Sequence, residues 1–202
     1  MKEKANIAVL VSGGGTNLQA LIDAKAAGLI PHGEFVAVIS NVADAYALER
    51  ARQGGIPAIT ILKSECGSQE DFESVLYDSL ESMDVDLIVL AGFLNVLSAD
   101  FVSKYPKRII NIHPSLIPSF CGDGMYGLKV HHAALERGVK VTGATVHYVN
   151  EITDGGEIIM QKAVEVLPND TPATLQKRVM EEAEWILLPR ATELVCQKLL
   201  KG

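Results

Sequence analysis

The feature of this sequence that most constrains its fold is a repeated alternation of short apolar runs with helical patterns. Residues 7–11 form a continuous apolar run typical of a buried strand, and apolar residues recur at helical spacing from Leu18 to Ala26. Further strand-like runs lie at 35–39, 58–62, 87–90 and 109–112, and helical patterns lie at 46–53 and 69–82. This alternation predicts an α/β fold, a single domain with a mostly parallel, Rossmann-like twisted sheet and helices on both faces.

The second half of the chain contains two longer strand-like stretches, 144–149 and 157–166, on either side of the turn 153–156. This arrangement predicts a hairpin that closes the sheet. The longest stretch without a regular pattern is 114–127, and loops of that length in a compact domain usually carry function or are mobile.

A long helical pattern covers residues 171–201 at the end of the sequence. Thr171 and Pro172 are suited to open it, because proline is tolerated in the first turn of a helix. Pro189 lies inside the pattern and has no N–H to donate to the preceding turn, so we expect an interruption with a bend there.

Composition and charge exclude several classes of protein. The 202 residues are 48% hydrophobic and 21% charged, which fits a folded domain and not a disordered chain. No apolar run reaches the roughly 18 residues of a membrane helix, so we expect no anchor and no signal peptide. A net charge of −7 provides no broad basic face for nucleic acid. The three cysteines form no C-x-x-C pair, so we expect a cytoplasmic protein without disulfides or a metal ion.

A glycine-rich loop, residues 12–17, joins the first predicted strand to the first predicted helix. Backbone N–H groups at such a helix start, together with the helix dipole, favour an anion such as phosphate. The loop has no Lys followed by Ser or Thr, so it is not a Walker A loop for nucleoside triphosphates. It is not a dinucleotide-binding loop either, because Leu18 occupies the position of the third glycine in that fingerprint. A single phosphate group therefore suits it best, with Thr16 or Asn17 capping the helix. The alternative is a plain tight turn.

The strongest chemical signal is the polar end of the run 109–113. A strand places Asn111 and His113 on one face, and Pro114 keeps His113 extended at the carboxyl end, where α/β sheets bind their ligands. An amide and an imidazole can donate to one developing oxyanion, and Asp154 can favour a charged imidazole. The alternatives are a hydrogen-bonded core pair for Asn111 and His113 and an ordinary Asp-Gly turn for Asp154.

Four further residues have weaker signals. We expect His147 to be a sheet residue or a residue that supports the site from behind, His131 to open a short helix, and Trp185 to lie in the core. Glu184 is the polar neighbour of Trp185 and can face a ligand.

Four segments together resemble the phosphoribosylglycinamide formyltransferase family of folate-dependent enzymes, and the likeness runs through essentially the whole chain. They are residues 11–20, 90–94, 111–116 and 153–156. The segment N-x-H-P-S-L with a downstream D-G-G is shared by folate-dependent formyltransferases generally. The glycine loop and the chain length select this member family, and the resemblance implies the formyltransferase fold.

The resemblance implies a role for each matching residue. Asn111, His113 and Asp154 are the expected catalytic residues, and Gly15, Thr16, Asn17 and Glu184 are expected to bind glycinamide ribonucleotide. Leu94, Asn95, Val96, Leu97 and Asn111 are expected to bind 10-formyltetrahydrofolate, the formyl donor. The chain 1–202 then divides into a phosphate-binding half, 1–110, and a catalytic and folate-binding half, 111–202.

The implied reaction is formyl transfer from 10-formyltetrahydrofolate to the amine of glycinamide ribonucleotide in purine biosynthesis, without a metal. Three alternatives stay open. They are another formyltransferase that uses 10-formyltetrahydrofolate, a hydrolase of that donor, and a non-catalytic phosphate- or folate-binding module. Nucleic acid and membranes are not expected partners, and a homodimer stays open.

Overall fold

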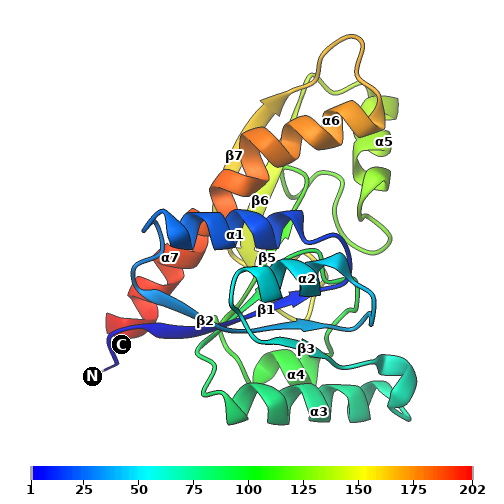
Figure 1. The fold of residues 1–202 in the computed structure, drawn as a ribbon. Helices are drawn as coiled ribbons and strands as arrows, with labels where there is room; N and C mark the ends of the chain where they lie inside the picture. Colours follow the sequence, from blue (N-terminus) through cyan, green and yellow to red (C-terminus); the bar gives the residue numbers. More distant parts are fainter. Residues whose placement is uncertain (1, 202) are drawn as a thin grey trace.

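Seven strands form one sheet in the order β3-β2-β1-β4-β5-β6-β7 in the computed structural model, which describes residues 2–201 (Figure 1). The strands β1 to β5 run parallel to one another, whereas β6 runs antiparallel to β5 and β7 runs antiparallel to β6. They are β1 (Ala5–Val11), β2 (Gly33–Ser40), β3 (Ala58–Thr60), β4 (Leu87–Leu90), β5 (Ile109–His113), β6 (Val141–Tyr148) and β7 (Ile158–Glu165). The predicted α/β fold, its mostly parallel sheet and the closing hairpin are confirmed.

Helices cover both faces of the sheet (Figure 1). Leu18 of α1 and Leu188 of α7 belong to the apolar cluster on one face, whereas Phe72 of α3 and Phe101 of α4 belong to the cluster on the other. Burial of these apolar side chains is what holds the layers together. The helices are α1 (Thr16–Ala26), α2 (Tyr46–Gln53), α3 (Gln69–Ser82), α4 (Ala99–Ser103), α5 (Leu128–Arg137), α6 (Pro172–Val179) and α7 (Trp185–Lys201).

Two of the predicted helices, 46–53 and 69–82, have the expected bounds, but the start of α1 differs from the prediction. Gly15 occupies the capping position with a positive φ of 72°, and neither Thr16 nor Asn17 caps the helix with its side chain. A Cβ on Gly15 would lie 2.6 Å from the Cβ of Ala47 in α2. The glycine is therefore required by backbone geometry and by the close approach of α2.

The sequence predicted an interruption of the C-terminal helical region at Pro189, but the interruption lies earlier in the chain. A π-helical segment, Met180–Glu184, separates α6 from α7, and Pro189 lies inside α7. The segment ends one turn before Pro189, next to Trp185, whose carbonyl Pro189 cannot bond. Segments of this kind widen a helix locally and occur often at functional sites.

The remaining differences concern short elements and element ends. The pattern did not predict α4 or a 3₁₀ turn at Lys63–Glu65, and β6 begins at Val141 instead of residue 144. Residues 110 and 111, the boundary expected between the two halves, are neighbours within β5. Both expected halves therefore contribute to one continuous sheet. Among residues 2–201, no helix is long and apolar enough to cross a bilayer.

Candidate active site

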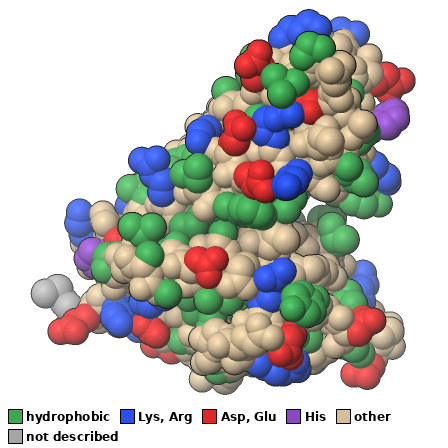
Figure 2. Space-filling view, turned by 45° about the horizontal axis from the view of Figure 1, so that its top comes forward, with side chains coloured by type: hydrophobic (Ala, Val, Ile, Leu, Met, Phe, Trp, Pro, Cys, Tyr) green, Lys and Arg blue, Asp and Glu red, His purple; other side chains and the backbone are tan. Residues whose placement is uncertain are grey.

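A cavity of about 440 Å³ lies at the carboxyl ends of β1, β4 and β5. The strand order reverses between β1 and β4, and α/β sheets bind ligands beside such a reversal. Ten of the eleven predicted site residues line the cavity: Thr16, Asn17, Leu94, Asn95, Val96, Leu97, Asn111, His113, Asp154 and Glu184. Gly15, the eleventh, is the residue next to Thr16. Figure 2 shows Lys and Arg side chains interspersed with Asp and Glu on the face drawn.

The imidazole of His113 is buried between two acceptors. Its Nδ1 lies 3.4 Å from Oδ2 of Asp154, and its Nε2 lies 2.9 Å from the backbone oxygen of Phe120. Burial lowers the pKa of His113, while Asp154 and the Phe120 carbonyl act in the opposite direction. The expectation that Asp154 favours the charged imidazole holds for this one contact, but burial outweighs it, and the net direction is downward.

Asn111 lies opposite His147 across the β5–β6 pair. The Nδ2 group of Asn111 lies 3.2 Å from Nε2 of His147, and Nδ1 of His147 lies 2.8 Å from the backbone oxygen of Tyr148. Because a carbonyl can only accept, Nδ1 carries the hydrogen and Nε2 accepts one N–H of Asn111. This contact fixes the orientation of the Asn111 amide and leaves its second N–H for a ligand.

His147 therefore supports the site from the sheet, and what the sequence pattern did not reveal is which residues it contacts. Only the antiparallel register places it beside Asn111, and its Nε2 also lies 3.5 Å from Oδ1 of Asp154. Two polar residues on one face of neighbouring strands were the available signal, but the sequence did not specify which strands pair.

The turn that carries Asp154 has unusual backbone geometry. Asp154 has a positive φ of 56°, and its Oδ2 accepts a hydrogen bond of 2.9 Å from the backbone N–H of Gly122. Burial raises the pKa of the Asp154 carboxyl, but the hydrogen bond from Gly122 and the nearby imidazoles of His147 and His113 outweigh that effect, so the net direction is downward. Asp154 is thus held as a carboxylate at neutral pH.

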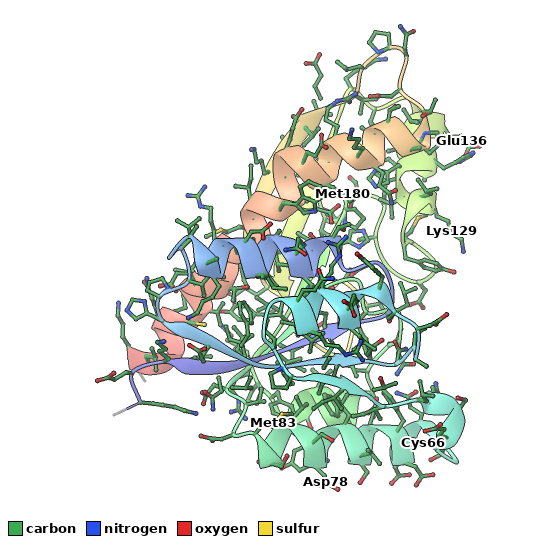
Figure 3. All side chains as sticks on the ribbon, viewed as in Figure 1. Cys66, Asp78, Met83, Lys129, Glu136 and Met180 are labelled. Atoms are coloured by element: carbon green, nitrogen blue, oxygen red, sulfur yellow. The ribbon has the colours of Figure 1, made fainter. Side chains whose placement is uncertain are left out.

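Glu184 and Asn17 lie together at the opposite side of the cavity. Nδ2 of Asn17 donates a 2.7 Å hydrogen bond to Oε2 of Glu184, although the two residues are 167 positions apart. Burial raises the pKa of Glu184 to about 7, and the hydrogen bond from Asn17 opposes that rise. Met180, labelled in Figure 3 at the start of the π-helical segment, lines the same cavity. The segment that interrupts the helix thus faces the site.

The segment 94–97 forms an apolar edge of the cavity. The side chains of Leu94 and Val96 are largely exposed, whereas Leu97 is buried. Asn95 lies between them with a buried amide N–H group that has no partner among the described residues, and its Oδ1 accepts a 3.4 Å contact from Lys63. An apolar edge with a free donor suits a flat heterocycle that carries acceptors.

His131 was predicted to open a short helix, and it lies in the first turn of α5, three residues after the start of that helix, where it is fully buried. Neither ring nitrogen has a hydrogen-bond partner within residues 2–201, and burial together with the nearby His113 lowers its pKa to about 4. Trp185 differs from its prediction as a core residue, because it is only half-buried and lines a second, shallow cavity beside α1.

We expect His131 to make the fold acid-sensitive. Its folded-state pKa of about 4 lies below its ordinary value of 6.5, so the unfolded chain binds a proton first as the pH falls below 6.5. Between pH 7.5 and pH 5, this residue should lower the free energy of unfolding by about 2 kcal/mol. Urea unfolding of His131→Leu at both pH values should show a pH difference smaller by that amount. His132→Leu, at the exposed neighbouring position, is the control, and equal pH differences in all three proteins would contradict the assignment.

The described residues contain no group of three or more His, Cys, Asp or Glu side chains arranged to hold a metal ion. The site as observed consists of an amide, two imidazoles and a carboxylate at one end and a second carboxyl group at the other. This set can donate hydrogen bonds to a developing oxyanion and accept a proton from an amine, which are the requirements of acyl transfer.

Comparisons with known proteins agree with this description. Residues 5–192 match the formyl transferase family. The phosphoribosylglycinamide formyltransferase of Escherichia coli is 44% identical over 177 residues, which are 88% of this chain and 81% of that protein. The solved structure of glycinamide ribonucleotide transformylase 1 from Symbiobacterium toebii has a TM-score of 0.91 and 41% identity, covering 98% of this chain and 90% of that one.

A longer relative contains the same unit. The trifunctional purine biosynthetic protein adenosine-3 of Gallus gallus is 46% identical over 192 residues. The match covers 95% of this chain but 18% of that protein. The comparison with it therefore concerns one segment of that protein and not the rest of its length.

Proposed function

We infer the activity from the premise that this chain belongs to the formyl transferase family: it transfers a formyl group to the amine of glycinamide ribonucleotide, a step of purine biosynthesis. Relatives that match most of this chain at 43% and 44% identity bear the name of that activity. The observation that carries the proposal is the meeting of Asn111, His113 and Asp154 at the end of β5, within one cavity.

We further propose that Asn111, His113 and Asp154 perform the chemistry. The reaction forms a bond between the amine nitrogen and the formyl carbon, breaks the bond from that carbon to the donor nitrogen, and moves one amine proton to the departing nitrogen. The free N–H of Asn111 and the imidazole of His113 donate hydrogen bonds to the oxygen on which negative charge develops. Asp154, a carboxylate 3.4 Å from His113, stabilises the charged imidazole and accepts the amine proton.

We propose that the two ends of the cavity bind the two substrates. The backbone N–H groups at the start of α1, from Gly15 to Asn17, hold the phosphate of the ribonucleotide, because a helix start attracts anions. Glu184 contacts the glycinamide end of that substrate. The substrate amine then lies between Glu184 and Asp154, within the one cavity that both side chains line.

The formyl donor in this proposal is 10-formyltetrahydrofolate. Leu94 and Val96 offer apolar contact to its ring system, and the unpartnered amide N–H of Asn95 offers a donor to its heteroatoms. The backbone of residues 149–154 lies across the cavity and offers further polar groups. When bound, the donor supplies the activated formyl group. Both proposed substrates are small soluble molecules, which fits the expected cytoplasmic location.

The test is a two-substrate assay of the purified protein. Release of tetrahydrofolate is followed by absorbance with glycinamide ribonucleotide and 10-formyltetrahydrofolate together, and with each omitted in turn. We expect release only when both are present. Release without the ribonucleotide indicates a hydrolase, and no release in any mixture contradicts the proposal. Replacing the ribonucleotide with an amino-sugar nucleotide tests the remaining formyltransferase alternative.

The Glu184→Gln variant should weaken binding of the ribonucleotide without affecting the formyl donor. Loss of a charged acceptor is worth about 1.5 to 3 kcal/mol, so the KM for the ribonucleotide should rise at least tenfold. Because the pKa of Glu184 is about 7, this KM should also rise in the native protein as the pH falls below 7, and the variant should lack that dependence. Steady-state kinetics from pH 6 to 8 measures both effects. An unchanged KM for the ribonucleotide, or an equal rise for the donor, would remove Glu184 from that substrate's site.

A further inference from the structure

We propose that the backbone carbonyl of Phe120 is a positioning group for catalysis: it holds the Nε2–H of His113, so that Nδ1 is the nitrogen that meets the substrate oxygen. The inference rests on the proposed function, because it assigns which atom of the imidazole acts in that reaction. Four observations carry it: the anchoring of the loop base, the conformation of Phe120, the two hydrogen bonds from the loop into the site, and the surroundings of His113.

The base of the loop 114–127 is anchored to β6 by buried polar groups. The hydroxyl of Thr145 donates to the backbone oxygen of Ser115 at 2.7 Å and accepts the backbone N–H of Ile117 at 3.1 Å. The hydroxyl of Ser115 donates to the backbone oxygen of Ser119 at 2.5 Å. Thr145 and Ser115 are both fully buried. The chain that leads to Phe120 is therefore held in one place relative to β5 and β6.

Phe120 itself has a positive φ of 51°. This left-handed conformation is disfavoured for a bulky side chain and persists where the surroundings demand it. It turns the carbonyl of Phe120 toward His113, 2.9 Å from Nε2. Two residues further on, the N–H of Gly122, with a φ of 90°, donates to Asp154. The loop thus supplies one backbone acceptor to the catalytic imidazole and one backbone donor to its carboxylate.

The acceptor at Nε2 determines which nitrogen can exchange its proton during the reaction. A carbonyl oxygen has no hydrogen to donate, so Nε2 must be protonated in both the neutral and the charged imidazole. Nδ1 lies 3.4 Å from Asp154, beyond the usual 2.7 to 3.2 Å of a hydrogen bond, and is the less tightly held nitrogen. Nδ1 is therefore the site that gains and loses a proton and that donates to the substrate oxygen.

The titratable groups around His113 come from three elements. Asp154 belongs to the β6–β7 connection, His147 to β6, and His131 to α5. His131 is neutral at pH 7, because its pKa is about 4, and burial raises the pKa of the Cys121 thiol in the loop, which keeps it neutral too. Asp154 is then the main charge that acts on His113, and the Phe120 carbonyl is the main uncharged acceptor.

The test compares Phe120→Asn with Phe120→Val. The two side chains are similar in size, but asparagine tolerates a left-handed backbone, whereas a β-branched residue does not. The first readout needs no substrate: ¹⁵N NMR of histidine-labelled native protein above the His113 pKa identifies the protonated nitrogen of the neutral ring. We expect the Nε2–H form in the native protein and in Phe120→Asn, and its loss in Phe120→Val.

The second readout is the pH profile of kcat. Loss of the acceptor at Nε2 destabilises the charged ring, so the basic limb of kcat should move to lower pH in Phe120→Val, by about one pH unit. We expect kcat near pH 8 to fall about tenfold in that variant and to stay near the native value in Phe120→Asn.

Three outcomes would overturn the inference: an Nδ1–H ring in the native protein, the same NMR form in all three proteins, or equal pH profiles of Phe120→Asn and Phe120→Val. Thermal unfolding checks that both variants fold, and the NMR measurement on the native protein stands without them. If the protein transfers no formyl group, the proposed function fails while the NMR result still decides which nitrogen Phe120 holds.

Discussion

The His113→Ala variant should fold normally and lose most of its formyl transfer activity. Removal of one hydrogen-bond donor to an oxyanion typically costs about 3 to 4 kcal/mol of transition-state stabilisation, so we expect kcat to fall about 10² to 10³-fold. The two KM values should change little, because the lost interaction is made mainly in the transition state. Steady-state kinetics with both substrates, at a pH where the native protein is most active, measures the loss.

The control for this variant is His132→Ala, which removes an imidazole whose side chain is 70% exposed on α5. It should retain native kcat. Circular dichroism and thermal unfolding separate a catalytic loss in His113→Ala from a folding defect. A folded His113→Ala protein with native kcat would show that another group stabilises the developing charge.

The Gly156→Ala variant should damage both stability and catalysis. A Cβ at this position would lie 1.7 Å from the backbone oxygen of Tyr148, and real Cβ atoms almost never come within 3.0 Å of a heavy atom beyond their own and the adjacent residues. Because the neighbour is backbone, the turn or the end of β6 must move. Forced shifts of this kind cost roughly 1 to 3 kcal/mol, and we expect urea unfolding to show a loss at the upper end of that range, because the clash is with backbone.

The same shift should move Asp154, two residues away, out of its contacts with His113 and Gly122. We therefore expect kcat to fall at least 100-fold, even at a temperature where the variant is folded. Gly67→Ala is the matched control, since the nearest atom to its new Cβ is a side-chain oxygen of Asp71, which can rotate away. A Gly156→Ala protein with native stability would show that the turn tolerates the displacement.

Much of the fold could be predicted from periodicity alone. The central strand β4 is buried along its whole length and is therefore a short apolar run, the helix 46–53 ends before Gly54, and the helix 69–82 begins after the capping residue Ser68. The failures have local physical causes. Thr16 has good capping chemistry, but the close approach of Ala47 requires glycine at the capping position. Pro189 is tolerated in α7 because the preceding π-helical segment absorbs the irregularity.

The candidate site was predicted unevenly for a related reason. Asn111 and His113 stand two positions apart, so the strand period alone places them on one face. Asp154 could be linked to this pair only as a carboxylate that a distant turn can return to it, and Glu184 only as a polar neighbour of Trp185 that can face a ligand. The resemblance to a known family implied their roles. His147 was expected in the sheet or in support of the site, without a named partner. Contacts between residues far apart in sequence depend on which strands pair and in which register, and no local pattern contains that information.

By itself, the sequence determined the alternating elements, the glycine loop and the polar end of β5, because these depend on spacing along one strand or one turn. The tertiary structure decided the rest. Strand register brought His147 to Asn111, the fold of a long loop brought the Phe120 carbonyl to His113, and helix packing brought Glu184 to Asn17. Burial then shifted the pKa values of His113, His131 and Glu184 toward their uncharged forms. The loss of water around a charged group depends on the whole packed structure and not on the residues next to that group in the sequence.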